Sequence, residues 1–258
     1  MKTFIITCKK LQDRLPEAVK TATTLTNNYT PVRSWDAEEL NQEAIDDYGK
    51  IAKLRWTAAV KEIAPILQSN VQASQNQNEG AFQSYIENVN KYRKDKIIEV
   101  PNWMKSRCLS AGEISVLMKH FWAIGNIANG WDEYGLILED DVRVHDQSKK
   151  EFKMCLKEFI EQNGDYLDLA GGCNLHSGAE DTRLKYSSLL AIPRTRTNAA
   201  YIVRKDLAKT LMNKFLPLIF PIDWHLQYIM PKSANVFWAN KPPLIHGSEQ
   251  GLVSSWRQ

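Results

Sequence analysis

Residues 136–141 read Leu-Ile-Leu-Glu-Asp-Asp, so three apolar residues run straight into three acidic ones. This pattern predicts a buried strand that emerges at the edge of a sheet, where its carboxylates meet solvent or a ligand. Adjacent carboxylates repel one another, so a compensating positive charge is needed to hold them at the end of a buried strand. A hard divalent cation bound through oxygen atoms supplies that charge. The simpler alternative is a solvated acidic turn.

The residues before this run predict a capped helix that leads into the strand. Ser110 and Glu113 have the spacing of a capping box, and apolar residues then recur at helical spacing as far as Ile124. Asn129 and Gly130 form a stop signal, and a strand is expected over residues 134–138. Ligands bind at the carboxyl ends of strands in open α/β sheets, so the acidic run marks a candidate site.

The rest of the chain alternates between strand and helix patterns. Residues 3–37 read as strand, helix and strand, and residues 42–67 and 81–93 read as two helices around a polar loop at residues 68–80. Further helices are expected over residues 152–160, 206–215 and 224–230, and further strands over residues 166–169, 189–192 and 199–203. This alternation predicts an α/β sandwich with a mostly parallel sheet.

The motifs around the acidic run resemble those of glycosyltransferase family 25, which includes bacterial lipooligosaccharide and collagen hydroxylysine galactosyltransferases. The resemblance rests on Leu-Ser-Ala-Gly-Glu-Ile at residues 109–114, on His120 and Trp122, and on Leu-Glu-Asp-Asp-Val at residues 138–142. Lys119 departs from the pattern, because the family usually has serine there. Weaker matches lie at residues 4–14, where Thr7 replaces asparagine, and at residues 33–36, 198–201, 221–223 and 246–255.

The resemblance implies the GT-A glycosyltransferase fold, a Rossmann-like, mostly parallel sheet flanked by helices. It implies one catalytic domain over residues 1–258, with a nucleotide-sugar-binding half at residues 1–145 and an acceptor-binding half at residues 146–258. Residues 42–106 have no match and are expected to form a helical insertion. That insertion either shapes the acceptor site or covers one face of the sheet.

Transfer of a sugar from a nucleotide donor assigns roles to the acidic residues. The leaving diphosphate gains negative charge, which Mn²⁺ or Mg²⁺ neutralises as a Lewis acid. Residues i and i+2 of a strand face the same side, so Glu139 and Asp141 are expected to bind this metal together. Asp140 would then point toward sugar or ribose hydroxyls. The resemblance makes His246 a candidate third ligand, and the alternative is an ordinary core or surface histidine.

An inverting transfer, which the family implies, also needs a base that accepts the proton of the acceptor hydroxyl. Asp223 is the candidate for this base. The alternative is that Asp223 caps the helix that follows, because aspartate is a preferred N-cap residue.

Further polar residues are candidates for contact with the nucleotide donor. The resemblance suggests Thr7 and Asp36, whereas Lys9, Arg14, Arg194 and Arg196 carry cationic groups that suit a diphosphate. For these four the alternative is solvation of the surface. Gly171 and Gly172 would allow a ligand to approach the backbone closely, or they form a simple tight turn.

Composition narrows the class of partners. The chain has 33 basic and 30 acidic residues, a net charge of +3, which argues weakly for an anionic ligand and does not favour nucleic acid. Its apolar runs are too short to span a bilayer, and the apolar stretch at the N-terminus is too short for a signal peptide. We therefore expect a cytoplasmic protein with at most peripheral membrane contact.

These observations predict an inverting, metal-dependent glycosyltransferase. It would move a hexose, galactose or glucose, from a UDP-sugar to a hydroxyl of a glycan, a lipooligosaccharide or a protein. The alternatives are a metal-dependent nucleotidyltransferase and a non-catalytic sugar- or partner-binding module of the same fold. The substitutions at Lys119 and Thr7 leave the binding module open, whereas the intact acidic run argues against it.

Overall fold

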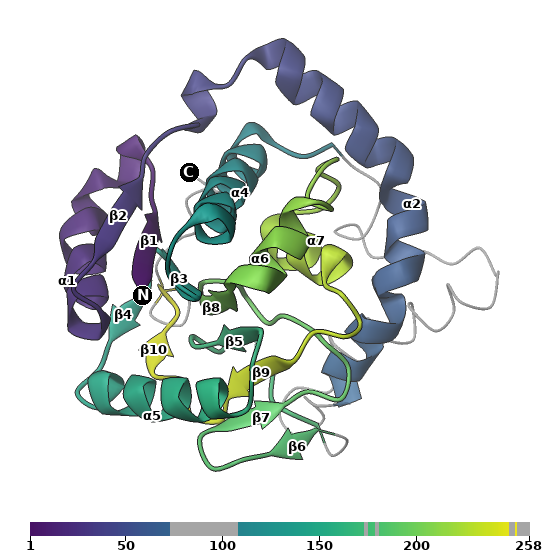
Figure 1. The fold of residues 1–258 in the computed structure, drawn as a ribbon. Helices are drawn as coiled ribbons and strands as arrows, with labels where there is room; N and C mark the ends of the chain where they lie inside the picture. The colour runs from purple at the N-terminus through teal and green to yellow at the C-terminus, as the bar shows by residue number, and fades with distance from the viewer. Residues whose placement is uncertain (73–107, 173–174, 179–180, 248–250, 252–258) are drawn as a thin grey trace.

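A central eight-stranded sheet with helices on both faces forms the body of the molecule (Figure 1). The computed structural model describes residues 1–72, 108–172, 175–178, 181–247 and 251. The strand order is β2-β1-β3-β8-β5-β9-β7-β6, and β8 and β7 run in the opposite direction to the rest. The fold is therefore mixed α/β with a largely parallel sheet, which confirms the expected class.

The elements follow the chain in two groups, before and after the acidic turn. The first group is β1 (Lys2–Ile6), η1 (Lys9–Arg14), α1 (Leu15–Leu25), β2 (Tyr29–Val32), η2 (Ala37–Glu39), α2 (Gln42–Gln72), α4 (Ala111–Asn129) and β3 (Tyr134–Glu139). The second group is β4 (Arg143–Val144), α5 (Ser148–Glu161), β5 (Tyr166–Asp168), β6 (Thr182–Arg183), β7 (Ser187–Leu189), β8 (Ala200–Arg204), α6 (Lys205–Met212), α7 (Ile222–Ile229), β9 (Val236–Ala239) and β10 (Leu244–Ile245).

Two apolar layers hold the helices to the sheet. Successive strand residues face opposite sides, so Phe4 of β1 packs with α4, α6 and α7, while its neighbour Ile5 packs with α1 and α5. Helix α2 runs along the outside of the first layer (Figure 1) and contributes Ala52 to it, while its Trp56 packs on Phe220 with ring centroids 4.8 Å apart. Within the described ranges, no helix combines the length and apolar character needed to cross a membrane.

The strand directions bring one set of ends to a single edge of the sheet. Strands β1, β3 and β5 end there, and the antiparallel β8 begins there, because Leu138 pairs with Ala200 and Asp168 pairs with Tyr201. The acidic turn after β3 therefore lies beside the start of β8 and near the end of β5.

Three sequence expectations need comment. The first helix of the expected insertion continues to Gln72, so residues 68–72 are helical and not loop, because polar residues without glycine or proline do not by themselves end a helix. The second helix, residues 81–93, lies outside the described residues. The strand expected at residues 189–192 is instead β7 (Ser187–Leu189), where Ser187 and Ser188 are buried and hydrogen-bonded to Glu158 and Asn240.

The capping box predicted at the start of α4 is confirmed and yields a stability prediction. Ser110 Oγ accepts a hydrogen bond from the Glu113 N–H at 3.2 Å, and the Glu113 carboxylate accepts one from the Ser110 N–H at 2.9 Å. Ser110→Ala should lower the free energy of unfolding by about 1 kcal/mol. Ser110→Asp, which can still cap, should stay close to the unchanged protein. Urea denaturation measures both, and equal midpoints for Ser110→Ala and the unchanged protein would contradict this role.

Candidate active site

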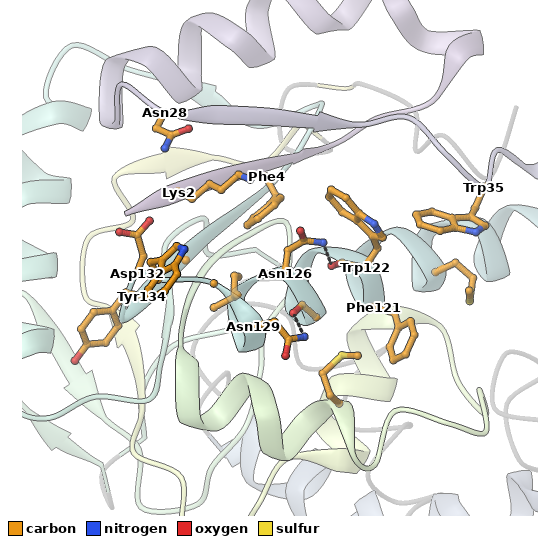
Figure 2. Close-up of a pocket in the computed structure, with 17 residues that line it drawn as sticks. Lys2, Phe4, Asn28, Trp35, Phe121, Trp122, Asn126, Asn129, Asp132 and Tyr134 are labelled. Atoms are coloured by element: carbon orange, nitrogen blue, oxygen red, sulfur yellow. Dashed lines mark hydrogen bonds between the residues drawn. The ribbon is translucent and has the colours of Figure 1, made fainter.

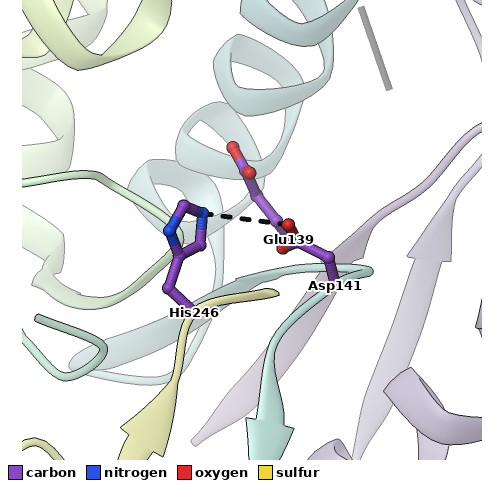
Figure 3. A group of neighbouring side chains, drawn as sticks. All are labelled: Glu139, Asp141 and His246. Carbon is purple, nitrogen blue, oxygen red and sulfur yellow. Dashed lines mark ion pairs between the residues drawn. The ribbon is translucent and has the colours of Figure 1, made fainter. Parts of the chain in front are cut away.

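Glu139, Asp141 and His246 meet at the carboxyl end of β3 (Figure 3). Each residue offers one potential ligand atom, and these three atoms all lie within 4.8 Å of one another. Glu139 closes β3, Asp141 lies in the turn that follows, and His246 comes directly after β10, which pairs with β4 just beyond the turn. The structure thus brings together the three residues that the sequence proposed as a metal-binding group.

The surroundings of Asp141 fit a cation. Its Oδ1 atom is buried and has no hydrogen-bond partner among the described residues, and its Oδ2 atom lies 3.8 Å from His246 Nε2. Gly247 lets the backbone pass close by, because a Cβ atom there would lie 2.6 Å from Asp141 Cβ. Burying a carboxylate oxygen without a partner is costly. Two carboxylates and one imidazole form an oxygen-rich donor set that suits Mn²⁺ or Mg²⁺.

The pKa values of Glu139 and Asp140 are raised in this turn. Burial raises the pKa of Glu139 well above its ordinary value, and Asp141, Asp223 and Asp140 raise it further. Burial also raises the pKa of Asp140 to about 6. The group therefore concentrates negative charge in a poorly hydrated place, where a positive ligand is favoured.

A buried histidine orients Glu139. Burial lowers the pKa of His120 to about 3, so its ring is neutral and has one donor and one acceptor nitrogen. Its Nδ1 lies 2.9 Å from the Tyr201 hydroxyl, and its Nε2 lies 3.4 Å from Glu139 Oε1. Burial raises the pKa of Tyr201, so the phenol stays protonated and its hydroxyl donates a hydrogen bond to Nδ1. We infer that Nε2 carries the ring hydrogen and donates it to Glu139.

Asp223 does not cap helix α7, so that alternative is wrong. The helix spans Ile222–Ile229 with Pro221 at the N-cap position, which places Asp223 inside the first turn. Burial raises the pKa of Asp223 to about 7, the hydrogen bond from Asn198 opposes this rise, and the carboxylate of Asp168 adds to it. A carboxylate whose pKa lies near neutral pH can accept a proton from a hydroxyl and release it again.

Asn198 and Tyr166 hold Asp223 in place, and sequence reasoning gave neither residue a role. The Tyr166 hydroxyl donates to Asn198 Oδ1 at 2.6 Å, so the Asn198 amide group must face the other way, toward Asp223 and the Ile222 carbonyl, 3.3 Å from its Nδ2. Asn198 is buried and has a φ angle of 51°, a left-handed conformation that costs energy in residues other than glycine. Asn198 lies in a block of the sequence that resembles the family, which was the available signal.

A cavity of about 190 Å³ lies next to the acidic turn. Its lining includes Thr7, Lys119 and Asp140, so the structure brings Thr7 and Asp140 to one wall, as the sequence proposed. Arg14 lies behind Asp140, with Nη1 3.8 Å from the Asp140 Oδ1 atom.

Asp36 lies behind this wall and does not line the cavity. Only 1% of the residue is exposed, and its carboxylate pairs with Lys119 and accepts a hydrogen bond from the Lys9 N–H at 2.9 Å. The expected contact of Asp36 with the donor is therefore replaced by a buried ion pair with Lys119. The Lys9 ammonium group pairs with the partly exposed Glu39 outside the wall.

Arg194 is not available for the expected contact with a diphosphate. Its side chain is fully buried in an ion pair with Asp181, and its guanidinium group lies over the Trp238 ring at 4.9 Å. Arg196 covers the same ring at 4.9 Å and pairs with Asp168. Arg194 thus supports the fold around Trp238, a role that depends on partners the local sequence does not reveal.

A larger cavity, of about 610 Å³, lies against another side of α4 (Figure 2). Aromatic and amide side chains, among them Trp35, Trp122 and Asn126, line it together with Lys2 and Phe4 of β1. None of the acidic residues of the turn after β3 is among its described lining residues. The candidate active site is therefore the smaller, charged cavity and the carboxylates beside it.

Comparison with known proteins gives one match. A family model described as glycosyltransferase family 25 (LPS biosynthesis protein) matches residues 1–226. This range includes the acidic turn and Asp223, while His246 lies beyond its end. A search of curated proteins finds no match.

The buried pair of Lys119 and Asp36 yields a second stability prediction. Both side chains are 2% exposed, so Lys119→Met leaves an uncompensated buried carboxylate. We expect a loss of about 3–5 kcal/mol in the free energy of unfolding. Adding Asp36→Asn removes that charge and should recover part of the loss. Chemical denaturation of the single and double variants tests this, and a double variant no more stable than Lys119→Met would contradict it.

Proposed function

The chain belongs to glycosyltransferase family 25, and from this membership we propose that it is an inverting, metal-dependent glycosyltransferase with the GT-A fold. It transfers a hexose, galactose or glucose, from a UDP-sugar to a hydroxyl of a glycan, lipooligosaccharide or protein-linked acceptor. The convergence of Glu139, Asp141 and His246 at the end of β3 carries this proposal. The nucleotide-binding half is residues 1–145, and the acceptor-binding half is residues 146–258.

The donor binds along the carboxyl ends of β1 and β3. Glu139, Asp141 and His246 would hold Mn²⁺ or Mg²⁺, which neutralises the charge that develops on the leaving diphosphate. Asp140 and Thr7 line the adjacent cavity, where their oxygen atoms can bind hydroxyl groups of the ribose or sugar. Lys119 in the same wall is paired with Asp36, and the pair fixes the shape of the wall behind the donor.

Asp223 acts as the base of the transfer. The Asn198 amide keeps its carboxylate oriented, and the pKa of about 7 leaves a substantial fraction ionised near neutral pH. In an inverting transfer, this carboxylate takes the proton of the acceptor hydroxyl as that oxygen attacks the anomeric carbon. Asp223 lies close enough to Glu139 for its charge to raise the pKa of Glu139, which supports one reaction centre for the base and the metal group.

Metal dependence of donor binding is the first functional prediction. The carboxylates repel a diphosphate, so UDP should bind at least about tenfold more tightly with Mn²⁺ than with a chelator, a difference of about 1.4 kcal/mol. Asp141→Asn should abolish this gain, since it removes a ligand charge with little change of shape. Asp146→Asn, on an exposed residue outside the group, is the matched control and should keep it. Calorimetry that finds equal UDP affinity in Mn²⁺ and in chelator would refute the metal assignment.

The second functional prediction concerns Asp223. Asp223→Asn should lower UDP release from UDP-galactose or UDP-glucose by about two to four orders of magnitude, the usual contribution of general base catalysis. Binding of UDP with Mn²⁺ and the melting temperature should hardly change, because the amide keeps the size of the side chain. The exposed Asp206→Asn on α6 is the control and should leave the rate unchanged.

The pH profile gives an independent reading of the same assignment. A base with a pKa of about 7 is protonated and inactive at lower pH, so the rate of the unchanged protein should fall as pH drops below about 7. The residual rate of Asp223→Asn should lack this fall. Near-normal turnover by Asp223→Asn would exclude Asp223 and make Asp140 the next candidate.

A further inference from the structure

A second charged cavity lies along the same edge of the sheet, beyond the metal group. Its volume is about 420 Å³, and its lining includes Gly171, Gly172, His176, Arg183, Arg196 and Asn240. No acidic side chain is among its described lining residues. Leu244 and Ile245 also line it, and His246 follows them directly. We call this cavity the arginine pocket.

Arg196 presents a fixed guanidinium edge in this pocket. The residue is only 8% exposed, its Nε donates to Asp168 Oδ1 at 3.0 Å, and its plane lies over Trp238. Nη2 donates a hydrogen bond to the backbone carbonyl oxygen of Asp168 at 3.4 Å and forms an ion pair with Asp168 Oδ1 at 2.8 Å. Nη1 takes no part in these contacts and lies 3.8 Å from the place where a Cβ atom on Gly171 would stand. The edge that carries Nη1 is therefore turned toward the cavity wall at Gly171.

Two glycines, Gly171 and Gly172, form part of this wall. Gly171 and Gly172 have φ angles of 69° and 121°, which side-chain-bearing residues rarely adopt. A Cβ atom on Gly171 would lie 2.8 Å from Pro242 Cγ, and one on Gly172 would lie 2.5 Å from Thr197 Cγ2. The pocket is thus a preformed space between backbone and guanidinium, of a size that small-molecule sites have.

Arg183 adds a second cation at the rim. It is exposed on β6 and forms no ion pair within the described part of the chain. Asp168 offsets the charge of Arg196, so Arg183 adds an unpaired positive charge among the described lining residues. A guanidinium edge with a second cation beside it is the arrangement that recognises a carboxylate or a phosphate.

We propose that the arginine pocket binds an anionic group of the acceptor, so that the acceptor is an acidic or phosphorylated glycan. This inference rests on the proposed function only in naming the bound molecule as the acceptor. Strand β5, which leads into the pocket, is separated from β3 by β8 alone, so the two strand ends lie about 10 Å apart. An anionic substituent on the acceptor sugar, or on the sugar next to it, spans that distance.

Binding to the whole chain, without metal or UDP-sugar, tests the pocket separately from catalysis. Glucuronic acid, glucose 6-phosphate and methyl glucoside are titrated in turn, and the amide signals of Gly171, Gly172 and Asn240 are followed by NMR. The two anionic probes should shift these signals and bind at least about tenfold more tightly than methyl glucoside. The tighter of the two tells whether carboxylate or phosphate is preferred.

Two variants identify the groups responsible. Arg183→Gln should weaken both anionic probes, whereas Lys185→Gln, an exposed lysine near Arg183 but outside the described lining, should not. Arg196→Lys keeps the positive charge beside Asp168 and should preserve the fold, yet it removes the guanidinium edge and should weaken binding about tenfold. Circular dichroism verifies the fold of each variant.

Equal binding of neutral and anionic probes, or binding that neither arginine variant weakens, overturns the arginine pocket. Displacement of glucuronic acid by UDP with Mg²⁺, with shifts at the same amides, also overturns it, because the pocket would then belong to the donor. Anion binding in a protein that turns over no UDP-sugar would sustain the pocket and refute the proposed function. Turnover of a UDP-sugar without preferential binding of anionic probes would sustain the proposed function and refute the arginine pocket.

Discussion

Repulsion among carboxylates at the end of β3 is the constraint around which the site is arranged. Glu139, Asp140, Asp141 and Asp223 are neighbours: burial raises the pKa of Glu139, and the charges of the other three carboxylates raise it further. Three of these four carboxylates have a local support: Arg14 stands beside Asp140, neutral His120 beside Glu139, and the Asn198 amide beside Asp223. None of these supports neutralises the shared space between Glu139, Asp141 and His246. That remaining negative charge is the physical reason to expect a cation there.

A column of stacked rings joins the two halves of this arrangement. The rings of His120 and Tyr201 stack with centroids 5.8 Å apart, and those of Tyr201 and Tyr166 at 5.1 Å. One end of the column holds Glu139 through His120, and the other holds Asn198, and through it Asp223. Metal ligand and base are therefore positioned by one packed unit beneath the sheet edge. Buried polar groups whose hydrogen bonds are satisfied in this way gain rigidity, which a reaction with strict geometry needs.

Local patterns predicted those parts of the structure that local forces determine. The strand ending in carboxylates and the capping box at Ser110 both depend on residues close in the chain. Glu139 and Asp141 do come together, but Asp141 lies in the turn after β3, so strand alternation is not the cause. The errors have tertiary causes. Helix α7 begins at Ile222, two positions earlier than expected, which removes Asp223 from the cap, and Asp181 reaches Arg194 from a separate part of the chain. The roles of Tyr166 and Asn198 exist only because β5 pairs with β8, a contact that no short pattern encodes.

The departure at Lys119 shows how one substitution can be read in two ways. From the sequence, a lysine in place of the family's serine left room for a module that had lost its activity. In the structure, Asp36 compensates the lysine charge, and the two form a buried pair that closes the cavity wall behind Asp140. A charge that is fully compensated inside the fold does not oppose binding of a cation at Glu139 and Asp141. The cost of burying this ion pair is instead consistent with a wall that must keep its shape while a charged donor binds against it.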